Sequence, residues 1–238
     1  MTDPAPPTPA RPSAAPALSC HALACEAGGR ELFRDLTLEI AAGERIAVVG
    51  PSGSGKTTLL TTLAGLGPPV SGRVLVGGVA LAGNPSLRAR IALVFQSYGL
   101  LTLLTAAENV EVALRAAGRT ARQAVSDAAG PLTRLGLARH AGHLIEELSG
   151  GQQQRVAVAR ALALEPSVLL ADEPTAEQDA AHREIVLGEL LAVAGRGGAL
   201  VIATHDAEVA ARCDRVVELR TATARAGGAG GVATAVTR

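Results

Sequence analysis

The sequence predicts an α/β fold in which a mostly parallel sheet carries a small antiparallel β subdomain and an inserted helical subdomain. A glycine-rich loop at 50–58 joins an apolar strand over 45–49 to a helix over 57–64. Later apolar runs, at 90–95, 168–171 and 199–204, each end at polar residues, as buried parallel strands do. Residues 103–148 instead carry apolar residues at helical spacing. A chain of 238 residues is long enough for one such domain.

The glycine-rich loop carries the chemistry of the predicted core. It fits the phosphate-binding pattern G-x-x-x-x-G-K-[ST], with the residues Gly50, Pro51, Ser52, Gly53, Ser54, Gly55, Lys56, Thr57 and Thr58. Glycines let backbone amides converge on one point, and the helix start that follows favours an anion there. Lys56 is the one lysine among the 22 Lys and Arg residues. The alternative is a glycine turn that binds nothing, but the preceding strand and the lone lysine favour a P-loop NTPase core.

The segments around this core predict the antiparallel β subdomain. Residues 19–26 alternate weakly between apolar and polar, and residues 31–40 alternate more clearly. A further short strand is expected over 73–78. Residues 1–17, which hold six of the 13 prolines, are expected to form a disordered leader, and residues 221–238 a disordered tail. We therefore place the folded domain at residues 18–220.

The helical subdomain is expected at about residues 100–150. Thr105 followed by Glu108, and Thr120 followed by Gln123, match the helix-start pattern in which side chain and backbone cap each other. The pair at 130–131, Gly-Pro, is expected to interrupt the second helix, because proline removes a helical hydrogen bond. A further helix over 153–164 follows the sequence Leu-Ser-Gly-Gly-Gln at 148–152, which offers a second anion-binding helix start.

Polar side chains stand at the ends of the predicted parallel strands. Gln96 follows the strand at 90–95, Asp172 and Glu173 end the next, and His205 follows the strand at 199–204. Carboxyl ends of parallel strands meet at the edge where such sheets bind ligands. A single strand-end Gln could simply cap its strand, and a single strand-end His is more often structural than catalytic. The paired acids after a run of leucines favour catalysis.

Composition limits the partners and the location. The formal net charge is +0, which gives no electrostatic basis for binding nucleic acid. No apolar run approaches the ~18 residues of a membrane span, and the first residues lack a signal-peptide layout. A cytoplasmic protein is therefore expected. Cys20, Cys25 and Cys213 have no metal-binding spacing and are expected to be buried or half-buried thiols.

Taken in chain order, these motifs resemble the nucleotide-binding domain of ABC ATPases over about residues 19–220. The signature at 148–152, between Gln96 and the paired acids, is the most specific of them. The resemblance implies that ATP phosphates bind the loop at 50–58 and that Mg²⁺ is held by Thr57, Gln96 and Asp172. It implies that Glu173 polarises the attacking water, that His205 contacts the γ-phosphate, and that Lys56 and Gln96 assist.

The resemblance also implies partners. In this family the signature, here Ser149, Gly150, Gly151 and Gln152, covers the ATP of a second domain, and Asp179 contacts that domain. The chain holds one copy of each motif, so we expect a head-to-tail pair, with a homodimer as the simplest form. Separate transmembrane permease subunits, docked near Gln96 and Tyr98, would hold the protein at the inner face of the cell membrane. The alternative is an ABC ATPase that drives a mechanical or assembly task through a membrane partner.

Two positions depart from the family's usual pattern. No aromatic residue stands at 24–30 to stack on adenine, and Phe33 falls within a predicted strand, so GTP use stays open beside ATP use. Gln178 precedes Asp179 where the family usually has leucine. The loop before the signature lacks the glycine typical of fused multidrug exporters. This makes the chain more similar to stand-alone ATPases of importers, or to those of the lipoprotein-release and macrolide-efflux type.

Overall fold

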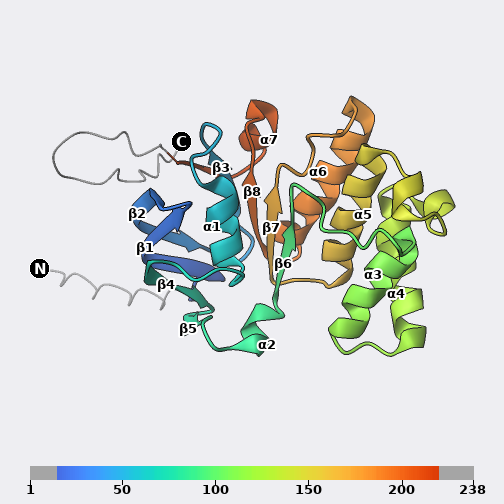
Figure 1. Ribbon diagram of the computed structural model, residues 1–238, viewed down its shortest axis with the longest axis horizontal. Coiled ribbons are helices and arrows are strands. Elements are labelled where there is room, and N and C mark those ends of the chain that lie inside the picture. Colours follow the sequence, from blue (N-terminus) through green and yellow to red (C-terminus); the bar gives the residue numbers. More distant parts are fainter. Residues whose placement is uncertain (1–14, 220–238) are drawn as a thin grey trace, which may run out of the picture.

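A computed structural model describes residues 15–219, and two sheets organise them (Figure 1). The parallel sheet has the order β6-β7-β8-β3-β9, and its strands are β3 (Arg45–Val49), β6 (Ile91–Val94), β7 (Val168–Asp172), β8 (Ala199–Ala203) and β9 (Arg215–Glu218). The antiparallel sheet has the order β2-β1-β4-β5, with β1 (Leu18–Ala27), β2 (Arg30–Ile40), β4 (Ser71–Val76) and β5 (Val79–Ala80). The predicted leader and tail lie outside the described residues, except for 15–17.

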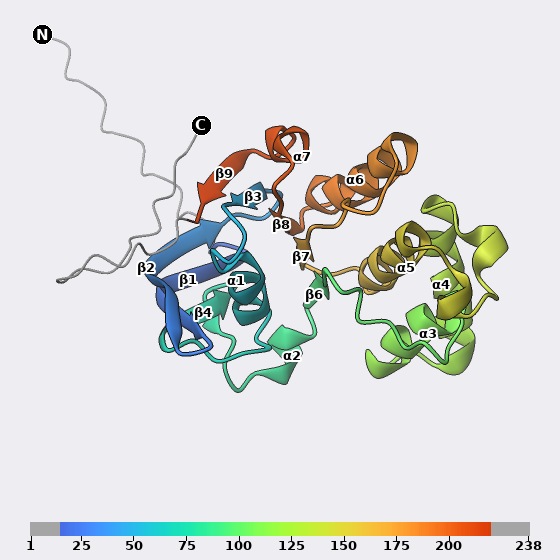
Figure 2. The same cartoon turned by 45° about the horizontal axis from the view of Figure 1, so that its top comes forward.

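The parallel sheet is buried on both faces, as its unbroken apolar runs predict. In β7 all five residues are buried, and the four apolar ones alternate between two cores. Val168 and Leu170 face a core shared with the antiparallel sheet and α1 (Lys56–Leu63), which lies between the two sheets (Figure 2). Leu169 and Ala171 face the helices on the other side. This arrangement holds the carboxyl end of β7 close to the start of α1.

The second core belongs to the helices. α5 (Gly150–Ala163) and α6 (Ala180–Gly195) cover the outer face of the parallel sheet, and α3 (Ala106–Ala116) and α4 (Ala121–Arg134) pack on α5 beyond it (Figures 1 and 2). Both predicted capping boxes form, at the starts of α3 and α4. The chain therefore builds a separate helical layer between β6 and α5.

One sequence-based expectation was wrong. The proline at 131 does not interrupt its helix, because α4 runs without a break to Arg134. Pro131 lies in the last turn, and both it and Leu132 are buried in the helical core. Packing of an apolar face stabilises the helix more than one missing hydrogen bond near its end weakens it. Some short elements were also not predicted: β5, α2 (Pro85–Arg88), α7 (Ala207–Ala211) and the 3₁₀ turns η1 (Ala138–His140) and η2 (Ile145–Glu147).

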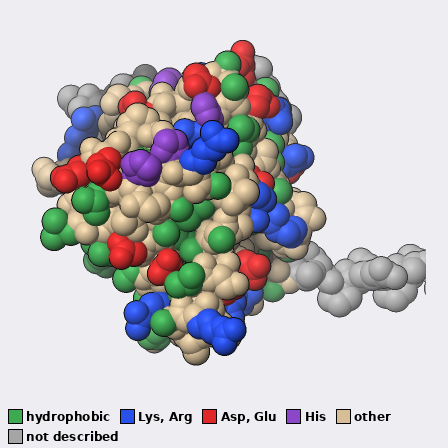
Figure 3. All heavy atoms as spheres, turned by 90° about the vertical axis from the view of Figure 1, so that its right-hand side faces the viewer, with side chains coloured by type: hydrophobic (Ala, Val, Ile, Leu, Met, Phe, Trp, Pro, Cys, Tyr) green, Lys and Arg blue, Asp and Glu red, His purple; other side chains and the backbone are tan. Residues whose placement is uncertain are grey.

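The helical layer forms one end of the molecule, and Figure 3 shows that end with acidic, basic and apolar side chains interspersed. Large apolar side chains are exposed near it, above all Leu103, which is 89% exposed in the loop between β6 and α3. Within residues 15–219, no helix combines the length and the hydrophobicity needed to cross a membrane.

Candidate functional site

The predicted phosphate loop forms a tight turn between β3 and α1. Gly50, Gly53 and Gly55 have positive φ angles of 154°, 76° and 96°, which favour glycine. Gly55 is the N-cap of α1, and no side chain caps this helix. The Lys56 ammonium donates to the carbonyl oxygens of Gly50 at 2.8 Å and Pro51 at 3.3 Å, so it lies back across the loop. The first amides of α1 are thus left for a ligand beside a positive charge.

The loop contains a further polar group that is ready for a ligand. Ser54 is 1% exposed, and its hydroxyl is among the buried polar atoms of the described chain that have no hydrogen-bond partner. Burying a hydroxyl without a partner is unfavourable, so an acceptor at this place would stabilise the loop. Uncapped amides, an ammonium and an unpaired hydroxyl together fit a phosphate group.

Two of the three predicted metal ligands meet beside the loop. The Thr57 hydroxyl donates to Asp172 Oδ2 at 2.5 Å, and Asp172 is 3% exposed at the end of β7. Burial raises the pKa of Asp172, although the Thr57 hydrogen bond opposes this shift. Hydroxyl and carboxylate oxygens are ligands that suit Mg²⁺. Gln96 does not join them: its side chain is exposed beyond β6 and forms no hydrogen bond with other residues of 15–219.

Glu173, the acid that follows Asp172, is paired with His205. Glu173 Oε1 lies 2.9 Å from His205 Nδ1, and its Oε2 accepts a 3.4 Å hydrogen bond from the Thr204 hydroxyl. The backbone of Glu173 is left-handed, with φ 48°. This turn directs a carboxylate that is only 11% exposed toward His205, whose side chain is 75% exposed. A carboxylate held in this way can accept a proton from, or orient, a water molecule.

The signature forms the start of α5, away from the phosphate loop. Ser149 caps α5 by accepting from the Gln152 amide at 3.3 Å, and Gln152 Oε1 accepts from the Ser149 amide at 2.9 Å. Ser149 and Gly150 are exposed. Gly151 packs so closely on the loop after β7 that a Cβ atom there would lie 2.6 Å from the Glu177 carbonyl oxygen. Within the described residues, no hydrogen bond or ion pair joins the signature to the loop at 50–58.

Asp179 lies near the signature, at the N-cap of α6. Its Oδ1 accepts from the His182 amide at 2.9 Å, and its Oδ2 lies 2.7 Å from His182 Nδ1. The backbone hydrogen bond from His182 lowers the pKa of Asp179. The predicted site residues therefore fall into two groups. One is the phosphate loop with Asp172, Glu173 and His205, and the other is the signature with Asp179.

Several residues of the second group were not predicted from the sequence. Gln154, on the first turns of α5, donates to the Glu173 carbonyl oxygen at 2.9 Å. Gln178 donates to the Gly151 carbonyl oxygen at 2.9 Å, and His182 holds Asp179. The sequence offered a signal only for Gln178, as a departure from a family pattern. Phe33 is 1% exposed beneath Gly55, so its ring is not available for stacking on a base.

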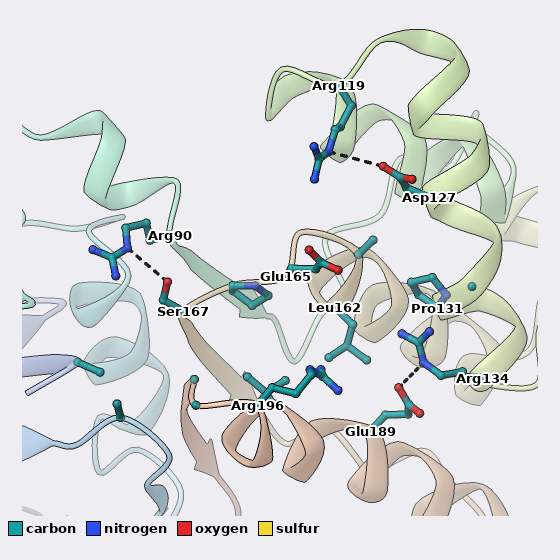
Figure 4. Close-up of a pocket in the computed structure, with 18 of the residues that line it drawn as sticks. Arg90, Arg119, Asp127, Pro131, Arg134, Leu162, Glu165, Ser167, Glu189 and Arg196 are labelled. Atoms are coloured by element: carbon teal, nitrogen blue, oxygen red, sulfur yellow. Dashed lines mark hydrogen bonds and ion pairs between the residues drawn. The ribbon is translucent and has the colours of Figure 1, made fainter.

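A large cavity among the described residues lies elsewhere. It measures about 1080 Å³ and opens near the amino ends of the parallel strands, between the sheet and α4 (Figure 4). Arg119 is paired there with Asp127, and Arg134 with Glu189 (Figure 4). None of the predicted site residues lines it. The candidate site is instead an open surface at the carboxyl ends of the strands.

Comparisons with known proteins agree with this arrangement. The sequence model described as ABC transporter matches residues 33–176. The chain is 45% identical over 192 residues to an uncharacterised ABC transporter ATP-binding protein of Mycobacterium tuberculosis, a match that covers 77% of this chain. It is 46% identical over 192 residues, covering 78% of this chain, to a macrolide export ATP-binding/permease protein of Bradyrhizobium diazoefficiens.

A solved structure is similar over most of the fold. This is a dimeric ATP-binding cassette in a post-hydrolysis state, bound to ADP and phosphate, with a TM-score of 0.79 and 33% identity. The match covers 86% of this chain and 96% of that one. The sequence relatives are longer: the match spans 58% of the mycobacterial protein and 29% of the macrolide exporter.

Proposed function

We propose a function from one premise: the chain belongs to the ABC transporter family of ATP-binding proteins and carries that family's ATPase domain. From this premise, the chain is the ATP-hydrolysing subunit of a bacterial ABC transporter. It works with Mg²⁺ as a head-to-tail dimer, and it drives separate transmembrane permease subunits from the cytoplasmic face of the membrane. The transport-related names of its relatives favour this function over a mechanical or assembly task.

The observation that carries the proposal is the division of the site into two groups. The phosphate loop, the paired acids and His205 form one surface, while the signature forms an exposed helix start that makes no hydrogen bond or ion pair with that loop within residues 15–219. A second copy turned head to tail brings a signature to each phosphate loop. The dimeric state of the similar solved cassette supports this pairing.

Each residue of the phosphate-loop surface then has a chemical role. Lys56 and the amides of 53–58 bind the phosphates of ATP, with Ser54 as a further donor. Thr57 and Asp172, with Gln96 after a movement of its loop, would hold Mg²⁺, whose charge stabilises the transferring phosphoryl group. Glu173 accepts a proton from, or orients, the attacking water, and His205 holds the Glu173 carboxylate and reaches the γ-phosphate.

The loop between β6 and α3 is the proposed permease contact. It begins at Gln96 and Tyr98 and exposes Leu101 and Leu103, which are 50% and 89% exposed. Apolar side chains exposed next to a site suit burial by a partner protein. A contact here would link the permease to the residue that completes the proposed Mg²⁺ site.

The test is light scattering during size exclusion on the Glu173→Gln variant, with and without ATP and Mg²⁺. This variant keeps the shape of the side chain and removes its proton-accepting charge. We expect nearly all turnover to be lost and an ATP-dependent dimer to accumulate. Glu165→Gln is the matched control, because Glu165 has the same left-handed φ of 48° but lies outside the site. It should hydrolyse ATP normally and form no trapped dimer.

Other outcomes have definite meanings. Lys56→Ala should lose nucleotide binding. It should therefore form no dimer, whether introduced into the wild type or into the Glu173→Gln variant. A Glu173→Gln protein that binds ATP and remains a monomer would contradict the homodimer. The same run with GTP tests the base preference: equal dimerisation with GTP would mean that the site does not select adenine.

A further inference from the structure

Two buried glutamine side chains connect the signature to the loop that carries Glu173. Gln178 is 9% exposed and Gln154 is 2% exposed. The Gln178 side-chain amide donates to the Gly151 carbonyl oxygen at 2.9 Å and to Gln154 Oε1 at 2.8 Å. Gln154 in turn donates to the Glu173 carbonyl oxygen at 2.9 Å, and its Oε1 also accepts from the Glu177 amide at 3.3 Å. We call this pair of side chains the glutamine clasp.

The partners of the glutamine clasp fix the orientation of both amides. Gln154 places its nitrogen on a carbonyl oxygen and its oxygen on an N–H group, so a flipped amide would lose both contacts. The Gln178 nitrogen faces two acceptors. Each of these hydrogen bonds thus joins a donor to an acceptor, and a buried network of this type favours one arrangement of the elements it joins.

Close packing reinforces the glutamine clasp. The backbone of Gly151 approaches the Glu177 carbonyl so closely that no side chain fits between them. Glu173 is joined on its other side to β8, since its amide donates to the Ala203 carbonyl oxygen at 2.9 Å. The signature turn, the loop from 173 to 179 and the end of β8 therefore form one connected unit.

We propose that Gln178 and Gln154 are positioning residues that make the signature turn and the Glu173 loop of one protomer move together. The consequence rests on the proposed function: in a head-to-tail dimer these two elements serve different ATP molecules. A shift of Glu173 at one site is then transmitted through the glutamine clasp to the signature that covers the other site. Gln178 thereby couples the two sites, which a leucine at this position cannot do by hydrogen bonding.

The first test uses the nucleotide-free monomer and needs no dimer. Gln178→Leu removes the donor, and it leaves the Gln154 oxygen bonded to the Glu177 amide and the Gly151 oxygen bonded to Arg155 Nε. No buried acceptor is stranded, so we expect the fold and ATP binding to persist. Hydrogen–deuterium exchange should rise about tenfold or more in both 149–155 and 173–179, because Gln178→Leu removes two hydrogen bonds made by a buried side chain.

The matched control is Gln153→Leu. Gln153 is the neighbour of Gln154 on α5, and it donates to the carbonyl oxygens of Ile145 and Leu148 instead. Its replacement should raise exchange near 145–149 and leave 173–179 unchanged. Gln154→Leu and the double variant complete a mutant cycle with Gln178→Leu. We expect the combined effect to be smaller than the sum, since each single change already breaks the glutamine clasp.

The second test measures coupling in the hydrolysing protein. With Gln178→Leu, the Hill coefficient for ATP hydrolysis should fall toward one, while ATP binding to the monomer stays within about twofold. Unchanged exchange in either segment of the Gln178→Leu monomer would overturn the glutamine clasp. Raised exchange with an unchanged Hill coefficient would overturn its coupling role. A parent protein that never dimerises would contradict the proposed function, and the exchange experiment would still decide whether the two segments move together.

Discussion

Two helices of this molecule begin at glycine-rich turns, and the two starts are built differently. α1 begins after Gly55, which is left-handed and provides no side-chain cap. α5 begins after Ser149, whose hydroxyl accepts from the Gln152 amide, while Gln152 Oε1 accepts from the Ser149 amide. The first start is surrounded by Lys56, Ser54 and Asp172, whereas the second is exposed to solvent.

The two helix starts differ in whether they are stable without a bound ligand. An uncapped helix start with an ammonium beside it depends on a ligand to satisfy its amides. A start closed by its own capping box is stable without a ligand and can serve as a preformed surface for another molecule. The α1 start therefore has the features of a primary binding site, and the α5 start those of a cover.

The largest effect is expected at the α1 start, for Gly50→Ala. A Cβ atom at Gly50 would overlap the Leu219 carbonyl oxygen and lie 2.8 Å from Ser54 Oγ. We expect nucleotide binding to be lost and the free energy of unfolding to fall by about 3 kcal/mol or more. Gly53→Ala is the control: its Cβ would meet open space, so only the left-handed backbone costs about 1–2 kcal/mol. Calorimetry and denaturant unfolding measure both, and equal losses would contradict the close approach at Gly50.

Asp172→Asn is expected to raise the free energy of unfolding of the nucleotide-free protein, by less than Gly50→Ala lowers it. Burial raises the pKa of Asp172, so ionising this carboxylate in the folded chain is unfavourable, and its contribution to stability is lost as pH rises through the folded pKa. The nucleotide-free variant should melt above the wild type at about pH 7, and this gap should narrow toward about pH 4. Turnover should fall about a hundredfold or more, because the variant lacks the carboxylate proposed to hold Mg²⁺. A variant that melts lower at neutral pH would contradict the prediction.

The smallest effect is expected at the α5 start. Gly151→Ala places a Cβ 2.6 Å from a backbone oxygen of Glu177. A Cβ at Gly150 would meet only side-chain atoms, the movable Glu177 carboxylate at 3.4 Å and the Tyr98 hydroxyl at 3.7 Å. We expect Gly151→Ala to lower the free energy of unfolding by about 1–3 kcal/mol and Gly150→Ala to leave it unchanged. Neither should alter ATP binding to the isolated monomer. Loss of that binding in Gly151→Ala would show that the two starts are not independent.

The comparison also indicates what a sequence can predict. The parallel strands were correctly expected from apolar runs because β7 and β8 are buried on both faces, and the capping boxes at Thr105 and Thr120 formed as expected because they depend on residues three positions apart. The approach of Asp172 to Thr57 was expected only through a resemblance to a family. Local patterns thus predicted the elements well.

What the sequence could not predict depends on packing between distant segments. Pro131 stays within α4 because a buried helix face outweighs one lost hydrogen bond. The contact of Gln178 with Gly151 joins residues 27 positions apart, and nothing in either local sequence signals it. Gln96 was expected to join Thr57 and Asp172, but its side chain lies exposed on the loop that follows β6. Such contacts follow from how whole layers fit together.

The position of β9 has a consequence for how the chain matures. In the parallel sheet β3 lies between β8 and β9, so the strand that leads into the phosphate loop gains its last neighbour from residues 215–218. Leu219 then donates its amide to the Val49 carbonyl oxygen at 2.8 Å, directly before Gly50. During synthesis the phosphate loop leaves the ribosome early. The strand β9, which completes the sheet beside it, follows only after almost the entire domain has been made. Pairing over such a sequence separation is slow to form. A nascent chain that ends before Arg215 would keep β3 as an unprotected sheet edge, open to aggregation.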